Sequence, residues 1–309
     1  MTFPKRMLKY IAHKKKTQKC LLKDLPMVGV EPTRGCPHKI LSLARLPIPS
    51  HRHKFNCHIH IISKSAVMAA TVEGGVTKTG TGNSSRIIDN TTNMPVPHAK
   101  VTLPKQNYTT YSDTDGGFNL NAKVDGTTVL SVEKEGYRPY SLTIDEKSAA
   151  RPIIVGIEKS KPNDLVIENA MLHLGDDNFS PNSANSSEFR AKSIGPFYSK
   201  TFQIAANAIS KTNYLVIGSI IGIDTLMARS LKQNSIVNSY ASPPEVYFNG
   251  SKIAEIQLNG DGQRIKIPNN LIRGGQINEV TIKTGRNMKQ TAYIDYDDIE
   301  IMNLSIQTE

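Results

Sequence analysis

The stretch SDTDGGFNL at residues 112–120 decides the fold of the first part of this chain. Asp113 is suited to cap a tight turn, and Gly116 to supply the positive φ that such a turn requires. Phe118 and Leu120 then flank a polar residue, a spacing typical of a strand with one buried face. The alternative, calcium coordination by the two aspartates, lacks the later acidic ligands of an EF-hand loop. The stretch therefore predicts a tight turn that leads into a half-buried strand.

Short runs of the same kind lie on both sides of this stretch. Upstream, Val101 and Leu103 alternate with polar residues, and downstream Leu130 and Val132 flank a serine. An Asp-Gly pair and a Glu-Gly pair punctuate the downstream part as turns. Short strands at this spacing predict an antiparallel β-sandwich.

The order and spacing of the motifs across this unit are specific. They are Gly75-Val76, Pro97-x-Ala99-x-Val101, residues 112–120, Leu130-x-Val132 and Gly136-Tyr137. Together they resemble a carboxypeptidase regulatory-like domain. The resemblance implies a seven-stranded, transthyretin-like β-sandwich over residues 71–160 that serves as a spacer, stabiliser or attachment module. The segment Thr77–Met94 departs from the family pattern, and we expect it to be a mobile surface loop between the first two strands.

A second β-rich unit follows a short linker at residues 159–163. Alternating apolar residues predict strands near residues 246–248, 254–258, 265–267, 280–282 and 299–306. In the last of these, the buried phase changes near Met302-Asn303, which predicts a bulge. Residues 224–231 predict a short helix with Asp224 as its N-cap.

The end of this unit also carries a family resemblance. Its motifs are Val246-Tyr247-Phe248-Asn249-Gly250, a run of apolar and turn residues over 265–282, and Asp297-Asp298-Ile299-Glu300-Ile301. They resemble a galactose-binding-like jelly roll, the architecture of non-catalytic carbohydrate-binding modules. The resemblance implies a jelly-roll β-sandwich over residues 164–309, and it is closest over 245–306. The predicted fold is thus all-β, with a transthyretin-like sandwich followed by a jelly roll.

Four acidic residues are candidate metal ligands in the second unit. In jelly-roll modules of this kind, a structural calcium ion is often held where the first and last strands meet. Asp176 and Asp177 follow the predicted first strand, and Asp297 and Asp298 begin the last one. Their carboxylate oxygens suit Ca²⁺. The alternative is that all four are solvated turn residues, and no other cofactor is expected.

Candidate ligand-binding residues are fewer, because the chain contains no tryptophan. Sugar-binding platforms use exposed aromatic rings, so we select Tyr247, Tyr293 and Tyr296, together with Asn249 in the turn after Tyr247. Ordinary packing is the alternative role for these side chains. Weak recognition of a soluble glycan fits this composition better than binding to a crystalline polysaccharide.

No catalytic motif is visible after residue 67. Only His98 and His173 remain there, without an H-E-x-x-H, G-x-S-x-G or glycine-rich phosphate-loop pattern. We therefore expect a non-catalytic binding protein that recognises a carbohydrate or a protein through the jelly roll. A structural spacer or assembly module of a surface protein is the alternative.

Residues 1–67 differ sharply from the rest, with a net charge of +12 against −1 for residues 68–309. Nucleic-acid binding through a disordered basic arm is one interpretation, and a metal site formed by its cysteines and histidines is another. The third is that the stretch is spurious, because residues 28–53 resemble an antisense translation of a transfer-RNA gene, and that the start is Met68 rather than Met1. No signal peptide or transmembrane run is visible, so localisation stays open; only the family resemblances suggest the cell surface.

Overall fold

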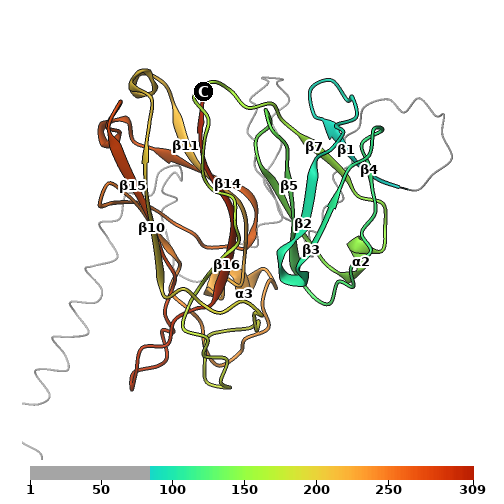
Figure 1. The fold of residues 1–309 in the computed structure, drawn as a ribbon. Helices are drawn as coiled ribbons and strands as arrows, with labels where there is room; N and C mark the ends of the chain where they lie inside the picture. Colours follow the sequence, from blue (N-terminus) through green and yellow to red (C-terminus); the bar gives the residue numbers. More distant parts are fainter. Residues whose placement is uncertain (1–83) are drawn as a thin grey trace, which may run out of the picture. The chain divides into compact units, whose positions relative to one another are not determined.

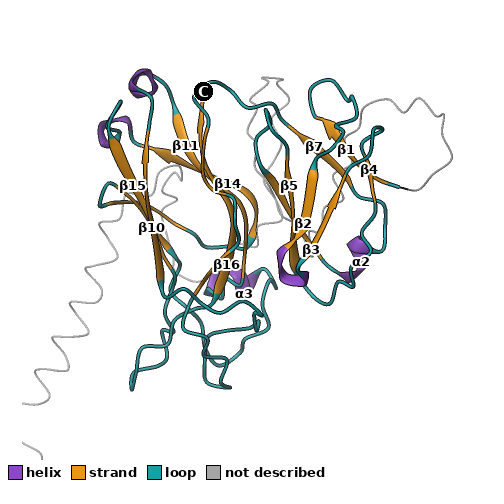
Figure 2. Cartoon of the chain, viewed as in Figure 1, coloured by secondary structure: helices purple, strands orange, loops and turns teal. Residues whose placement is uncertain are grey.

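A computed structural model describes residues 84–309, which belong to one compact unit. Strands dominate these residues and helices are short, as Figure 2 shows. The prediction of an all-β fold is therefore confirmed. The predictions for residues 1–67, and the motif Gly75-Val76, lie outside the described residues.

The first sandwich, residues 84–157, is built from seven strands in two sheets (Figure 1). One sheet has the order β4 (Gly117–Phe118), β1 (Ser85–Asp89), β7 (Ile154–Ile157). The other has the order β3 (Tyr108–Tyr111), β2 (Lys100–Leu103), β5 (Thr128–Glu133), β6 (Tyr140–Ile144). Side chains from both sheets meet in one core, among them Ile87, Val101, Leu130 and Val155. Their burial is what makes short strands stable together.

The turn at residues 113–117 forms as its sequence predicts. Asp113 Oδ1 accepts hydrogen bonds from the backbone N–H groups of Asp115 and Gly117, at 2.9 and 2.7 Å. Gly116 has a φ of 72°, and a Cβ at that position would collide with the carbonyl oxygen of Ile87. The carboxylate of Asp113 is therefore engaged in the turn itself.

The expectation of a surface loop over Thr77–Met94 is wrong for residues 85–89, which form β1. β1 pairs in parallel with β7, and Ile87 is fully buried. A strand this short carries only one buried phase, and parallel pairing joins it to residues almost 70 positions away. The polar residues around Ile87 therefore gave no strand pattern, and β1 depends on its pairing with the distant β7.

The second sandwich, residues 165–308, also consists of two sheets. One has the order β10 (Phe197–Gln203), β15 (Ile277–Lys283), β12 (Glu245–Phe248), β13 (Ser251–Glu255). The other has the order β14 (Gly260–Ile267), β11 (Asn213–Ile221), β16 (Ile299–Thr308), β8 (Leu165–Glu168), and β9 (Leu172–Leu174) also pairs with β16. Leu215, Phe248 and Val280 lie in the core between the sheets.

The last strand changes its buried phase as predicted. Ile299 and Ile301 enter the core before the change, and Leu304 and Ile306 enter it afterwards. Between them Asn303 takes a φ of 60°, which lets the strand continue with its apolar side chains facing inward.

Short helices connect some of these strands: η1 (Pro104–Gln106), α2 (Glu146–Ala149), η2 (Ala206–Ser210), α3 (Leu226–Ser230) and η3 (Asn269–Leu271). α3 confirms a helix after residue 224, but its N-cap is Thr225, whose hydroxyl accepts a hydrogen bond from Ala228 N. The prediction of Asp224 as the cap is wrong, because its carboxylate binds Ser186 instead. Within residues 84–309, no helix is long and apolar enough to cross a membrane.

Candidate functional site

Three long connections meet at one end of the second sandwich, which we call the loop end. They are residues 175–196 between β9 and β10, 222–244 between β11 and β12, and 284–298 between β15 and β16. Figure 2 shows these segments as the irregular loops below the sheets. Since both sheets send connections there, side chains far apart in the sequence come together at this end.

Asp295 ties two of these connections together. Its carboxylate accepts hydrogen bonds from Asn178 Nδ2, Ser183 Oγ, Ala184 N and Asn287 Nδ2, at 2.5 to 3.2 Å. The residue is 1% exposed. A buried carboxylate is tolerated when donors cover its oxygens, and here four donors do so. Asp295 therefore fixes the loop end structurally.

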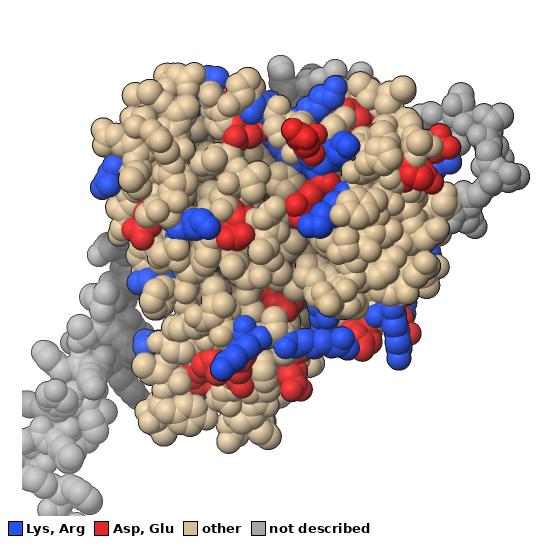
Figure 3. Space-filling view, viewed as in Figure 1, with Lys and Arg blue, Asp and Glu red and all other residues tan. Residues whose placement is uncertain are grey.

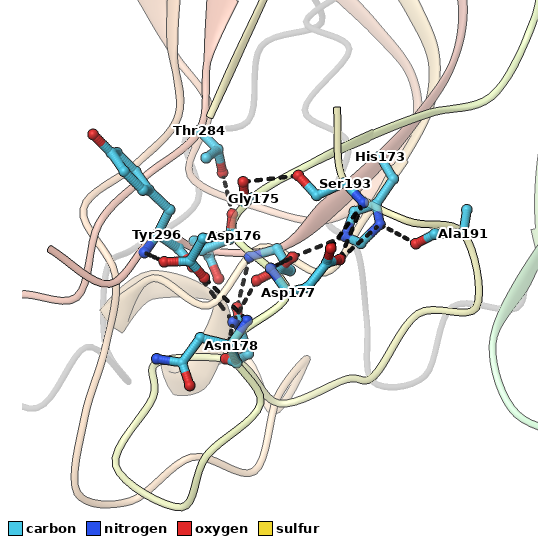
Figure 4. Close-up of polar contacts among 12 residues, drawn as sticks. His173, Gly175, Asp176, Asp177, Asn178, Ala191, Ser193, Thr284 and Tyr296 are labelled. Carbon is cyan, nitrogen blue, oxygen red and sulfur yellow. Dashed lines mark hydrogen bonds and ion pairs between the residues drawn. The ribbon is translucent and has the colours of Figure 1, made fainter. Parts of the chain in front are cut away.

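A second acidic group forms around Asp298, and Figure 4 shows its surroundings. Asp298 is buried and accepts hydrogen bonds from His173 Nε2 at 2.9 Å, Asp177 N at 3.0 Å and Asn185 Nδ2 at 2.7 Å. The backbone of Gly175 passes so close that a Cβ there would collide with the Asp298 carboxylate. The close approach of the two chain segments thus depends on this glycine.

His173 is held between two acceptors. Its Nε2 faces Asp298 and its Nδ1 faces the carbonyl oxygen of Ala191. Burial alone would lower the pKa of His173, but the hydrogen bonds to Asp298 and Ala191 outweigh burial and raise it. An acceptor at each nitrogen favours the doubly protonated ring, whose positive charge suits the neighbouring carboxylate of Asp298.

These two contacts of His173 decide how well the group suits a metal ion. One ligand atom each from His173, Asp177 and Asp298 lies within 4.8 Å of the others. A metal-bound histidine needs a free nitrogen lone pair, whereas each nitrogen of His173 already faces a hydrogen-bond acceptor. The three residues therefore fit an ion pair with its hydrogen bonds better than they fit a metal site.

Asp297 does not join the group around Asp298 but lies beside Asp224. Asp297 is fully buried; its Oδ2 accepts a hydrogen bond from Asp224 N at 3.1 Å, and its Oδ1 has no partner among the described residues. The carboxylate of Asp224 accepts hydrogen bonds from Ser186 N and Oγ. Burial raises the pKa of Asp224 to about 6, and burial together with the nearby Asp224 raises that of Asp297.

The four predicted calcium ligands are thus divided among separate contacts. Asp176 accepts hydrogen bonds from Asn178 N and Tyr296 N, and Asp177 accepts one from Ser193 N. The pair of Asp297 and Asp224 fits a hard cation best, because it combines two buried carboxyl groups with an unpartnered oxygen. The calcium site stays a prediction, and the sequence did not reveal that Asp224 lies beside Asp297.

The predicted sugar-binding residues lie on different elements. Tyr247 is on β12 and donates a hydrogen bond to Glu245. Asn249 lies in the turn after β12. Its Nδ2 donates hydrogen bonds to Leu271 O and Asn278 Oδ1, and its Oδ1 accepts one from Glu279 N. Tyr293 and Tyr296 lie in the loop before β16, and Tyr293 is 50% exposed. Binding by these four residues stays a prediction.

A pocket of about 610 Å³ opens at the loop end, and we call it the loop pocket. Its lining includes Phe179, Asn182, Asn185, Asn238, Lys289 and Gln290, together with three serines. None of the four predicted sugar-binding residues lines it. The signal in the sequence was the segment DNFSPNSANSS at 177–187, rich in asparagine and serine. Such composition predicts only a loop, so the pocket could not be foreseen.

Comparisons with known proteins place the first sandwich. No curated protein matches the chain. Among solved structures, a glycosyl hydrolase family 2 member from Bacteroides cellulosilyticus is 11% identical, with a TM-score of 0.25, over 46% of this chain and 20% of that one. The ANX2 ectodomain from Arabidopsis thaliana is 9% identical, with a TM-score of 0.22, over 69% and 73%. Both scores are too low to indicate a shared fold. Residues 84–166 match the family model of the CarboxypepD_reg-like domain, which confirms the family of the first sandwich.

Proposed function

We propose that this chain is a non-catalytic binding protein whose second sandwich holds a saccharide in the loop pocket. The observation that carries the proposal is the lining of this pocket, which combines carboxamide and hydroxyl groups with the aromatic ring of Phe179. Sugars present hydroxyl groups that both donate and accept hydrogen bonds, and apolar ring faces that pack on aromatic side chains. A concave site with a few polar groups and an aromatic wall matches that chemistry.

Several of these polar groups are available to a ligand. Within residues 84–309, the side-chain amides of Asn182 and Asn238 make no hydrogen bond, and both residues are exposed. In contrast, Asn185 is fully engaged with Asn178 O, Asp298 and Tyr296 O. The first two amides are therefore the groups that we assign to ligand recognition, and Asn185 holds its part of the lining in place.

The same surroundings support a non-catalytic role. The carboxylates of Asp295 and Asp298 are buried and covered by hydrogen-bond donors, so neither faces a ligand as an acid or base. His173 is occupied at both nitrogens. General acid–base catalysis needs such a group within hydrogen-bond reach of the ligand.

Glycan-array screening of the full chain, followed by calorimetric titration of the best ligand, tests the proposal. We expect Asn182→Ala and Asn238→Ala each to weaken binding about 2- to 12-fold, the effect of one lost neutral hydrogen bond. Asn207→Ala, at an exposed asparagine in η2 outside the pocket, is the matched control and should bind like the wild type. Failure of every glycan to bind would refute a saccharide-binding function.

A protein partner is the second candidate, and exposed apolar side chains favour it. α3 and the segment after it expose Leu226, Met227, Leu231 and Val237, the last by 80%. Apolar groups exposed together mark interaction surfaces more often than isolated ones do. Leu231→Lys would weaken a protein complex formed there and leave saccharide binding unchanged.

In the face shown in Figure 3, acidic and basic side chains are interspersed, and no broad basic patch favours nucleic acid.

A further inference from the structure

We propose that the loop pocket selects a saccharide that carries a carboxylate, such as a uronic acid, through Lys289 and Gln290. This inference rests on the proposed function and names the class of ligand for the same pocket. It follows from the charges of the lining, the hydrogen bonds of two neighbouring residues and the loop that holds them.

The only charge in the lining of the pocket is positive. Lys289 is its only charged residue, and no aspartate or glutamate lines it. The buried carboxylate of Asp295, which contacts the lining residue Ser183, accepts hydrogen bonds from Asn178, Ser183, Ala184 and Asn287. A ligand in the pocket therefore meets a cation and amides at contact distance, and the buried carboxylate acts on it only at longer range.

Lys289 is free to bind an anion. Among residues 84–309 it forms no ion pair, and its side chain is exposed. Its ammonium nitrogen lies 6.0 Å from the centre of the Tyr240 ring, an orienting contact at the edge of cation–π range. A carboxylate would replace water around this ammonium group and form a charge-assisted hydrogen bond.

Gln290 presents a donor beside Lys289. Its Oε1 accepts hydrogen bonds from the backbone N–H groups of Thr291 and Ala292, at 3.0 and 2.9 Å. These bonds fix which end of the carboxamide is oxygen, so Nε2 is the end that remains for a ligand. Lys289 and Gln290 are consecutive residues of the lining, and together they offer one donor for each oxygen of a carboxylate.

The loop that carries these donors is held in place before any ligand binds. The buried side chain of Asn287 accepts hydrogen bonds from Lys289 N, Gln290 N and Ser239 Oγ through its Oδ1. Its Nδ2 donates to Asp295 and to Asn182 O. Because the backbone of the donors is ordered in advance, less conformational entropy is lost on binding.

Calorimetric titration of the full chain with matched pairs of oligosaccharides tests the inference. Each pair consists of a glucuronate-, galacturonate- or mannuronate-containing oligosaccharide and its methyl ester, which has the same skeleton without the charge. We expect at least one acid to bind about tenfold more tightly than its ester, and added salt to weaken the acid selectively. Lys289→Met should remove this preference and leave binding of the ester unchanged, whereas Lys289→Arg should retain it.

Lys266→Met is the matched control, because Lys266 is an exposed lysine of β14 that does not line the pocket. Equal affinity for acid and ester in every pair would overturn the inference and leave the proposed function standing. Binding of neutral glycans alone, or of sulfated sugars in place of uronates, would also overturn it. If neither these ligands nor any glycan on the array binds, both the inference and the proposed function fail.

Discussion

Asp297 has a fully buried carboxyl group with one oxygen that accepts no hydrogen bond among the described residues. Asp224 lies next to it, and within residues 84–309 no basic side chain forms an ion pair with either residue. Burial raises the pKa of both carboxyl groups, which favours their neutralisation by a proton or by a cation. The calcium hypothesis assigns a cation to this pair.

The calcium hypothesis predicts a rise in thermal stability when Ca²⁺ is added to protein treated with EDTA. At 100 times the dissociation constant, a ligand that binds only the folded state stabilises it by about 2.7 kcal/mol. For a domain of this size, that raises the Tm by roughly 5 to 10 °C. Asp297→Asn, which keeps the shape and removes the charge, should abolish the rise, as differential scanning calorimetry would measure.

The control for this experiment is Asp115→Asn, an exposed aspartate in the turn of the first sandwich. It should respond to Ca²⁺ like the wild type. A Tm that is unchanged by Ca²⁺ in the wild type would refute the calcium hypothesis.

A second prediction concerns Asp164, which binds Arg138 through Nε at 2.7 Å and Nη2 at 3.2 Å. Burial alone would raise the pKa of Asp164, but Arg138 and the N–H groups of Lys161 and Thr308 outweigh burial and lower it. A lowered pKa in the folded state stabilises the protein above the unfolded pKa, about 3.9, and this contribution is lost as the pH falls through the folded value.

Asp164→Asn should therefore lower the free energy of unfolding by about 1.5 to 3 kcal/mol at pH 7. In urea titrations, the difference from the wild type should shrink below about pH 4, because Asp164 of the wild type then takes up a proton and loses its charge. Glu158→Gln removes the exposed partner of the same arginine, so it should cost less than about 1 kcal/mol. An equal loss for both variants at pH 7 would contradict the role assigned to Asp164.

Residues differ in how far the sequence reveals their roles. The turn around Asp113 was predictable because its hydrogen bonds are local, reaching only Asp115 and Gly117. The partner of Asp297 was not, because Asp224 lies 73 positions away and nothing in the local pattern of either residue links them. Long-range side-chain pairs depend on how the sheets bring their loops together.

At the scale of elements, alternation of apolar residues predicts long strands better than short ones. β16 was predictable, including its change of phase, because four isoleucine and leucine residues mark the two buried runs. β1 was not, because Ile87 is its only fully buried hydrophobic residue, and β7 provides the parallel pairing from across the domain. Antiparallel neighbours with tight turns leave a clearer local signal than such a strand.

The change of buried phase in β16 gives a prediction at this scale. Asn303 has a φ of 60°, a conformation that asparagine tolerates and a β-branched residue does not. Asn303→Val should lower the free energy of unfolding by about 2 kcal/mol or more, through backbone strain and the lost hydrogen bond to Ser131 Oγ. Asn303→Gly loses the hydrogen bond and adopts the conformation freely, so it should cost less. Equal losses in chemical unfolding would mean that strain at this residue is unimportant.

At the scale of the whole described region, polar contacts join strands of the two sandwiches. The carboxylate of Asp261 on β14 accepts hydrogen bonds from Thr143 N and Oγ1 on β6, and from Ser219 Oγ on β11. Beside them, Val129 of the first sandwich packs in a buried cluster with Phe189, Ile221 and Met302 of the second. These contacts use scattered hydroxyl groups and single apolar residues, which form no periodic pattern in the sequence. The sequence therefore predicts two domains but not the contacts between them.

These contacts predict that the two sandwiches unfold together. Differential scanning calorimetry should show one transition for residues 84–309, because separating the sandwiches would expose the Val129 cluster and leave Thr143 N without its acceptor. Met302→Asp buries an unpaired charge in that cluster, so it should split the transition in two, with the second sandwich melting first. Asp261→Ala should lower the single transition without splitting it, since it removes the hydrogen bonds and keeps the apolar contact. Two transitions already in the wild type would mean that the contacts are too weak to couple the sandwiches, and the first would then act as a tethered spacer rather than a rigid support for the loop pocket.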